Sequence, residues 1–222
     1  MARRDLCGRR RVTGVPTAMA GRESLLWFGH FRETDSGGSE HGERMSEIST
    51  LQYPLGQFRF DPQTCTEQRQ RLIREYGIFP EKLKAAVEGL TDEQLDTPYR
   101  PGGWTVRQVV HHLPESHMNG YVRLKLALTE ENHKAVVADE AAWAELNDSR
   151  NGPIALSLEL FRVLQQRWVV ALQTLSDPDF ERTMWHPAWG TVSLDYVVQS
   201  YAWHARHHIA HITGLRERMG WL

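Results

Sequence analysis

Histidines are concentrated in two short segments of this 222-residue chain. Seven of the eleven fall there: His111, His112 and His117 in the first segment, and His204, His207, His208 and His211 in the second. Neutral imidazole is the most common protein ligand for transition metals, and it also acts as a general acid or base near neutral pH. The two segments are therefore candidates for a metal site or an acid–base site.

The second segment lies in a helix predicted at about 194–219, where apolar residues recur with the helical period. His204 and His208 fall within the apolar stripe, whereas His211 lies at its edge and His207 well outside it. The i, i+4 spacing of His204 and His208 corresponds to a rise of about 6 Å, so both rings can reach one ion from the same side. The pair is predicted to supply two ligands of one metal site.

The first segment lies in a helix that begins with the capping box Thr105–Gln108 and continues to about residue 128. His117 is central in its apolar stripe and His112 lies on the border, whereas His111 is expected to face water. His112 points along the seam between helices and is the preferred third ligand. His117 is the rival, although its central place favours a packed histidine or one that orients a ligand. Pro114 predicts a kink near residue 110.

Three imidazoles with an open fourth position form the arrangement in which zinc binds water and lowers the pKa of that water to about 7. A single inward histidine is more often a hydrogen-bonded core residue, so HxxxH spacing alone is weak evidence. Two inward histidines and a third on another amphipathic helix favour a metal site, because an apolar core must otherwise hydrogen-bond all three.

Helical periodicity dominates the rest of the folded chain. Further helices are predicted at about 72–90, 139–146 and 155–175. Gly77 and Pro80 are expected to kink or split the first of these. The turn-rich stretch 185–190 predicts a small hairpin before the last helix. Together these elements predict an all-α protein built as a four-helix bundle, a fold that places metal sites in its core.

Composition argues against several other classes of protein. The chain has 26 basic and 28 acidic residues, a net charge of −2, whereas nucleic-acid binding usually needs a basic surplus. No apolar run is long enough to cross a bilayer, and no export signal is recognisable. The two cysteines, Cys7 and Cys65, predict neither a disulfide framework nor a cysteine-based zinc site. We therefore expect a cytoplasmic protein that binds neither membranes nor nucleic acids.

Residues 1–44 differ from the rest, because they contain eight arginines and no lysine. We interpret them as a disordered tail or as an extension upstream of a start at Met45. Acidic residues interrupt the segment, which argues against a targeting peptide. Residues 45–222 are then a single metal-binding helical domain.

Five stretches of the sequence resemble the YfiT family of metal-dependent hydrolases, part of the DinB-like superfamily. They are Tyr53–Gly56, Leu95–Arg100, Gly102–Leu113, Ser116–Asn119 and Trp203–His211. The resemblance implies a DinB-like four-helix bundle, a homodimer, and one divalent ion per subunit, zinc or nickel, held by His112, His204 and His208. Pro114 departs from the family, which usually has a small helix former there.

Three functional hypotheses follow. The first is a metal-dependent hydrolase of a small molecule, in which the ion activates water and Glu115, His211 or His186 transfers a proton. The second keeps the metal site but uses a thiol such as bacillithiol, mycothiol or glutathione in an S-transferase reaction, which the superfamily also includes. The third is a non-catalytic bundle with a structural metal, for which a fourth ligand such as His211 or His117 is expected.

Overall fold

The computed structural model describes residues 50–131 and 133–221. Four long helices form a bundle: α2 (Thr66–Val87), α4 (Val106–Thr129), α7 (Ile154–Gln173) and α9 (Leu194–Met219). The short helices are α3 (Asp92–Leu95), α5 (Glu140–Ala144), α6 (Asn147–Asn151) and α8 (Asp177–Glu181). Strands β1 (Thr183–His186) and β2 (Gly190–Ser193) form an antiparallel hairpin. The predicted four-helix bundle with a hairpin before the last helix is confirmed, whereas residues 1–44 lie outside the described part.

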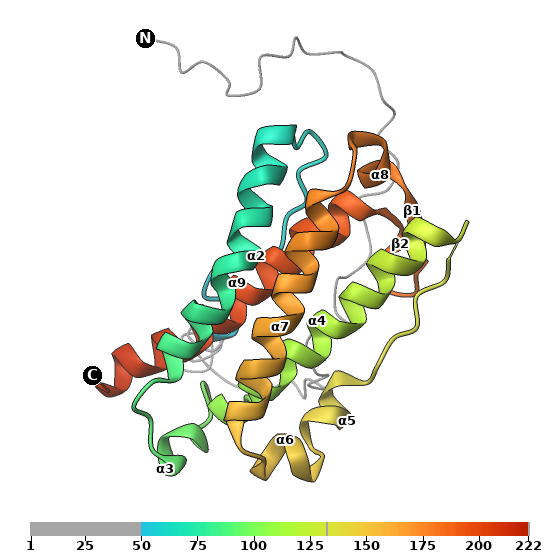
Figure 1. The fold of residues 1–222 in the computed structure, drawn as a ribbon. Coiled ribbons are helices and arrows are strands. Elements are labelled where there is room, and N and C mark those ends of the chain that lie inside the picture. The colour runs from blue at the N-terminus through green and yellow to red at the C-terminus, as the bar shows by residue number, and fades with distance from the viewer. Residues whose placement is uncertain (1–49, 132, 222) are drawn as a thin grey trace, which may run out of the picture.

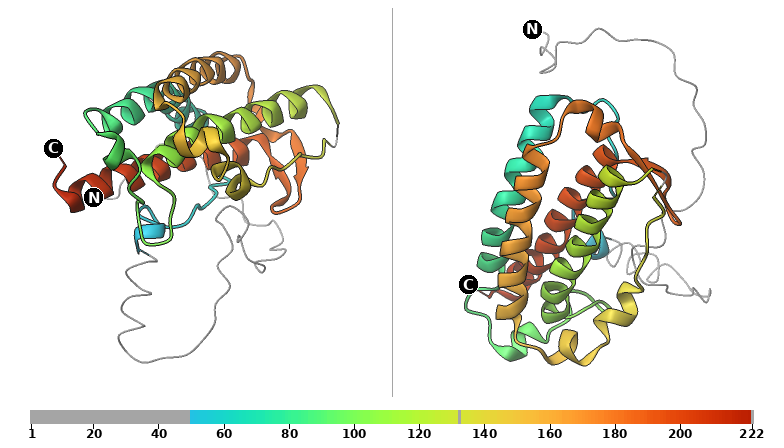
Figure 2. Two further views of the ribbon diagram at one scale, coloured as in Figure 1. Left: turned by 90° about the horizontal axis from the view of Figure 1, so that it is seen from below. Right: turned by 45° about the vertical axis from the view of Figure 1, so that its right-hand side comes forward.

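The order of the helices around the bundle explains why a long connection joins α4 to α7. Helix α7 packs against α2 and α4, and α9 packs against the same two helices. Helices α2 and α9 run toward the end that carries α3, whereas α4 and α7 run toward the end that carries α8 and the hairpin (Figures 1 and 2). The neighbours α4 and α7 are therefore parallel, unlike neighbours in an up-down-up-down bundle. Between them the chain must return along the bundle, and this return segment, residues 130–153, places α5 and α6 against α4.

Local sequence signals define where the helices that carry the histidines begin. The Thr105 hydroxyl accepts a hydrogen bond from the backbone of Gln108, whose side chain accepts one from the backbone of Thr105, as the capping box predicts. Ser193 caps α9 in the same way through the backbone N–H of Tyr196. At the other end, Gly220 adopts φ 65°, the left-handed conformation that commonly ends a helix.

Prolines inside the helices do not interrupt them. Helix α2 continues through Gly77 and Pro80, and α4 continues through Pro114. Of the two expectations for the first helix, a kink or a split, the split is therefore wrong. A proline removes one backbone N–H from the helix, but Pro80 and Pro114 both lie on buried surfaces whose packing holds the helices together.

Aromatic side chains fill the centre of the bundle. Trp168, Tyr76 and Phe161 are fully buried. Burial of each such side chain stabilises the fold by about 2–3 kcal/mol. Trp168 also donates a hydrogen bond from Nε1 to the carbonyl of His117 at 3.1 Å, which ties α7 to the middle of α4. The core thus fixes α4 beside α9, where the histidines meet.

Two further expectations from the sequence concern membrane-spanning segments and the two cysteines. In the described part of the chain, no helix is long and apolar enough to cross a membrane. Cys65 is the N-cap residue of α2, whereas Cys7 lies outside the described residues.

Candidate metal centre

His112 of α4 meets His204 and His208 of α9 where these two antiparallel helices pack together. The Nε2 atoms of His112 and His204 are 3.0 Å apart. One ligand atom from each of the three rings lies within 4.8 Å of the other two, and all three residues are buried. The structure thus brings together the three histidines singled out in the sequence, which we call the triad.

The triad fits a divalent ion. Nitrogen ligands at about 2.0–2.1 Å from a tetrahedral zinc lie about 3.3 Å from one another. The 3.0 Å between the Nε2 atoms of His112 and His204 is close to this value. In residues 50–131 and 133–221, no fourth histidine, cysteine or carboxylate joins the group. A tetrahedral ion held by these three residues would keep one position for water or substrate, as in catalytic zinc sites.

Burial sets the protonation of the triad. Desolvation is the main cause that lowers the pKa of His112 to about 3, and it holds the pKa values of His204 and His208 well below the ordinary value. Each imidazole also disfavours a positive charge on its neighbours. The rings are therefore neutral at physiological pH, and neutral imidazole is the form that binds a metal.

His207 and His211 are buried as well, although they lie outside the triad. His207 is fully buried, and its ring stacks on Trp203 at a centroid distance of 4.4 Å. The prediction that His207 lies well outside the buried face is wrong, because α9 is covered by α2, by α4 and by the segment around Tyr53, whose ring is 6.1 Å from that of His207.

His111 also differs from the prediction. It was expected to face water, but it is only 7% exposed. Its Nδ1 lies 2.7 Å from Ser157 Oγ and its Nε2 lies 3.1 Å from the carbonyl oxygen of Gly152. The end of the return segment and the start of α7 cover this side of α4, a contact that the helical period of α4 alone cannot reveal.

His117 occupies the position expected of a packed histidine rather than of a ligand. Its Nδ1 lies 2.7 Å from Nε2 of Gln165, and its ring centroid is 5.6 Å from that of His204. It is not part of the three-residue group. His117 therefore packs behind the triad and contacts its His204 ring.

The three residues considered for proton transfer lie in different surroundings, and none joins the triad. Glu115 is half-buried, and burial raises its pKa. His211 lies 3.1 Å from the carbonyl of Gln52 through Nε2. His186 lies in the hairpin and stacks on Trp189 at 3.8 Å.

Glu140 is the carboxylate beside the triad, and sequence analysis missed it. Its Oε2 lies 4.0 Å from Nε2 of His112, and its side chain is 21% exposed, so solvent can reach it. Burial is the main cause that raises the pKa of Glu140 to about 7, while the positive charge of Arg123 opposes the shift. Glu140 begins the short helix α5 after its N-cap Asp139, and only the return segment brings it to α4. The local sequence pattern predicts helix α5 but does not show that α5 packs against α4.

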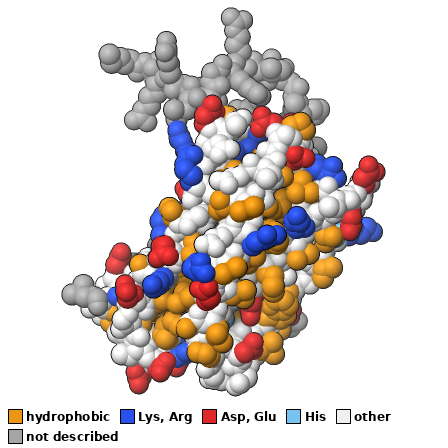
Figure 3. Space-filling view, in the orientation of Figure 1, with side chains coloured by type: hydrophobic (Ala, Val, Ile, Leu, Met, Phe, Trp, Pro, Cys, Tyr) orange, Lys and Arg blue, Asp and Glu red, His pale blue; other side chains and the backbone are white. Residues whose placement is uncertain are grey.

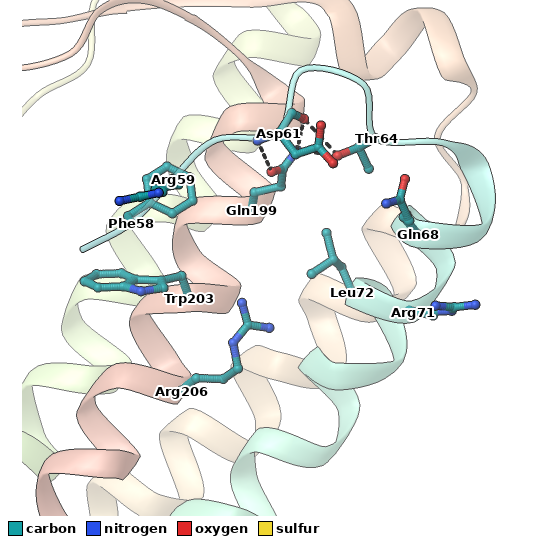
Figure 4. A pocket seen from close by; sticks show the side chains of 10 residues that line it. All are labelled: Phe58, Arg59, Asp61, Thr64, Gln68, Arg71, Leu72, Gln199, Trp203 and Arg206. Carbon is teal, nitrogen blue, oxygen red and sulfur yellow. Dashed lines mark hydrogen bonds between the residues drawn. The ribbon is translucent and has the colours of Figure 1, made fainter. Parts of the chain in front are cut away.

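A hollow of about 290 Å³ lies elsewhere on the molecule, between α2, α9 and the chain before α2 (Figure 4). Gln199, Trp203 and Arg206 line it from α9. These residues lie roughly 100–160° around the axis of α9 from His204. The hollow is thus separate from the triad.

Comparison with known proteins agrees with the fold. The family model of the DinB superfamily matches residues 78–212, and the chain belongs to this superfamily. More particularly, the chain is 49% identical to YfiT of Bacillus subtilis over 172 residues, which are 77% of this chain and 97% of YfiT. It is 50% identical to a protein of Oceanobacillus iheyensis over 169 residues, which are 76% of this chain and 98% of that protein.

Both relatives bear the name “putative metal-dependent hydrolase”. A solved structure of Bacillus subtilis YfiT aligns with a TM-score of 0.76 and 49% identity, covering 78% of this chain and 99% of that one. It is described as “a probable metal-dependent hydrolase with an unusual four-helix bundle topology”. The names of both relatives and the description of the solved structure thus refer to a metal-dependent hydrolase.

Proposed function

We propose that this protein is a metal-dependent hydrolase whose ion is held by His112, His204 and His208. The buried three-histidine group with one open position carries the proposal. A divalent ion in such a site polarises a carbonyl or a related group and activates water. Zinc is the expected ion because it favours tetrahedral nitrogen sites, and nickel is the second candidate. The names of the two relatives support the same reaction class.

Glu140 is the proposed proton acceptor. A general base must reach the proton that it takes, either directly or through one water. The 4.0 Å between Glu140 Oε2 and His112 Nε2 places this carboxylate beside the triad, on a side that solvent reaches. It can accept a proton from the attacking water and return it to the leaving group. This geometry favours Glu140 over Glu115, His211 and His186 for the role.

We further propose that the protein is a homodimer with one ion in each subunit. Helix α7 exposes a stripe of apolar residues, Leu156, Leu160, Val163 and Val170, which are 43–70% exposed. Hydrophobic side chains gather over this helix and its neighbours in Figure 3. Large exposed apolar patches mark interaction sites. A second copy presents the same stripe, as a two-fold interface requires.

Hydrolysis of a panel of small 4-nitrophenyl esters tests the reaction class. We expect turnover by zinc- or nickel-loaded protein in buffer without thiol, loss of turnover after chelation, and recovery when the metal is restored. The double variant His204→Ala/His208→Ala is the control for a metal outside the triad. Turnover that requires added glutathione or another thiol would favour an S-transferase instead. Turnover that survives chelation would contradict both metal-dependent reactions.

A further inference from the structure

A buried arginine lies near the triad without a close carboxylate partner. Arg123 of α4 is only 5% exposed. Within residues 50–131 and 133–221, no carboxylate oxygen lies within 4.0 Å of its guanidinium group. Buried charges in proteins are normally paired, because removing a charge from water is costly. The charge of Glu140 interacts with that of Arg123 from beyond ion-pair distance, so an arginine buried without an ion pair in the described structure needs a reason beyond stability.

The guanidinium group is held in place but keeps free donors. Its Nη1 donates to the hydroxyl of Tyr201 at 2.7 Å, and its Nη2 donates to the carbonyl of Val136 at 3.1 Å. Its Cζ lies 5.7 Å from the centre of the Trp189 ring. A guanidinium has five N–H donors. The Nε–H is buried and has no hydrogen-bond partner in the described structure, so Arg123 keeps a hydrogen-bond donor that the described residues do not satisfy.

The residues that hold Arg123 connect it to the triad. Tyr201 precedes His204 by one turn of α9, and the two ring centroids are 6.0 Å apart. Ser116 follows His112 by one turn of α4, is buried, and interacts with Glu140 and Tyr201, lowering the pKa of each. Eleven residues after His112, Arg123 lies on nearly the same face of α4, offset by about 20°. Ser116 on α4 and Tyr201 on α9 therefore lie between the triad and the guanidinium along the two helices.

We propose that Arg123 binds a carboxylate group of the substrate while the bond to be cleaved lies at the triad. This inference rests on the proposed function and names its substrate class: small esters or amides that carry a carboxylate at the end remote from the cleaved bond. Arginine suits this role because its planar donors match the two oxygens of a carboxylate. Tyr201 is a positioning residue, since its hydroxyl holds Nη1 and thereby aims the remaining donors.

Binding of non-reacting probes tests the proposal. Succinate and glutarate are titrated calorimetrically at pH 8 into metal-loaded and metal-free protein, and their uncharged diamides are the matched controls. We expect a dicarboxylate to bind wild type at least ~10-fold more tightly than its diamide, because a hydrogen bond to a charged group is involved. Arg123→Gln should abolish this preference. Arg162→Gln, which alters an exposed arginine paired with Glu159, should retain it.

Equal binding of dicarboxylates and diamides by wild type would overturn the proposal, as would a preference that survives in Arg123→Gln. If Arg123→Gln does not fold, as judged by circular dichroism, the binding of the same probes to metal-free wild type provides the test. A dicarboxylate preference there cannot come from the metal and supports the arginine site, whereas its absence overturns it. Metal content measured on the same samples distinguishes the two proposals. About one ion per chain without a preference for dicarboxylates would contradict only the proposed carboxylate site. A preference for dicarboxylates without a bound ion would contradict only the proposed hydrolase activity.

Discussion

Nε2 of His112 lies 3.0 Å from Nε2 of His204, although 92 positions separate the two residues in the chain. The contact requires that α4 and α9 pack together and that each helix turns its histidine toward the other. The start of a helix fixes which residues share a face. Thr105 and Ser193, which cap these helices, therefore help to determine the geometry of the triad.

Replacement of Gly120 by alanine is expected to destabilise the protein. A Cβ at Gly120 would lie 2.5 Å from Cζ of Tyr201, whose ring is fully buried. Alanine in a helix normally gains about 1 kcal/mol over glycine, but forced overpacking costs about 1–3 kcal/mol. We therefore expect a net loss of up to about 2 kcal/mol in the free energy of unfolding, measured with urea. Gly77→Ala is the matched control, because its Cβ would meet only Val169 Cγ2 at 3.9 Å.

Gly77→Ala should stabilise the protein by about 0.5–1 kcal/mol. The close approach of Tyr201 to the backbone of α4 would be refuted if both alanine variants were stabilised equally.

Glu140→Gln should reduce hydrolysis by about 10²–10⁴-fold, because the amide cannot accept a proton. Metal content should remain that of wild type, since Glu140 is not part of the triad. Glu115→Gln is the control, and we expect turnover within a few-fold of wild type. Steady-state kinetics of the metal-loaded variants provide the measurement. A Glu140→Gln enzyme as active as wild type would remove Glu140 from the reaction.

His186 is expected to make the protein less stable in acid. Burial is the main cause that lowers its pKa from 6.5 to about 4, and the charge of Arg123 acts in the same direction. Between these pH values the unfolded chain binds a proton that the folded chain does not. The contribution of His186 to stability is therefore complete above pH 6.5 and is lost as the pH falls toward 4.

His186→Asn removes this titration and retains an acceptor for the backbone N–H of Ala188, which lies 3.2 Å from His186 Nδ1. Because solvent screens part of the shift, we expect the free energy of unfolding of wild type to fall by about 1–2 kcal/mol more than that of the variant between pH 7 and pH 4.5. Urea unfolding at the two pH values measures this difference. Parallel losses in the two proteins would show that His186 does not titrate in this way.

The apolar stripe on α7 predicts a dimer that charged substitutions dissociate. Leu160→Glu/Val163→Glu should convert the dimer to a monomer, because a carboxylate is costly to bury in an apolar interface. Light scattering coupled to gel filtration gives the mass directly. Leu146→Glu changes an exposed apolar residue away from α7 and should remain dimeric. A monomeric wild type would contradict the proposed dimer, whereas a double variant that stays dimeric would place the contact elsewhere.

The elements that local patterns define were predictable from the sequence. The last helix was expected at about 194–219 and occupies Leu194–Met219. The capping box at Thr105 and Gln108 marks the start of α4. With both helical phases known, the inward direction of His112, His204 and His208 followed from the period of 3.6 residues per turn.

The remaining features depend on contacts between distant segments. His111 and Glu140 both owe their surroundings to the return segment, which exists because α4 and α7 are parallel neighbours. The burial of His207 depends on the chain around Tyr53. The helical period describes one helix face at a time, so it cannot show that another segment covers the opposite face.

Metal content of the purified protein tests the central claim most directly. Tag-free wild type, prepared without chelator, is compared by elemental analysis with His204→Ala/His208→Ala. His207→Gln/His211→Gln serves as the matched control, since it alters an i, i+4 pair on the same helix outside the triad. We expect about one zinc or nickel ion per chain in wild type and in the control, and none in the alanine variant. A wild type without metal, or an alanine variant that retains it, would contradict the assignment of the triad as the metal site.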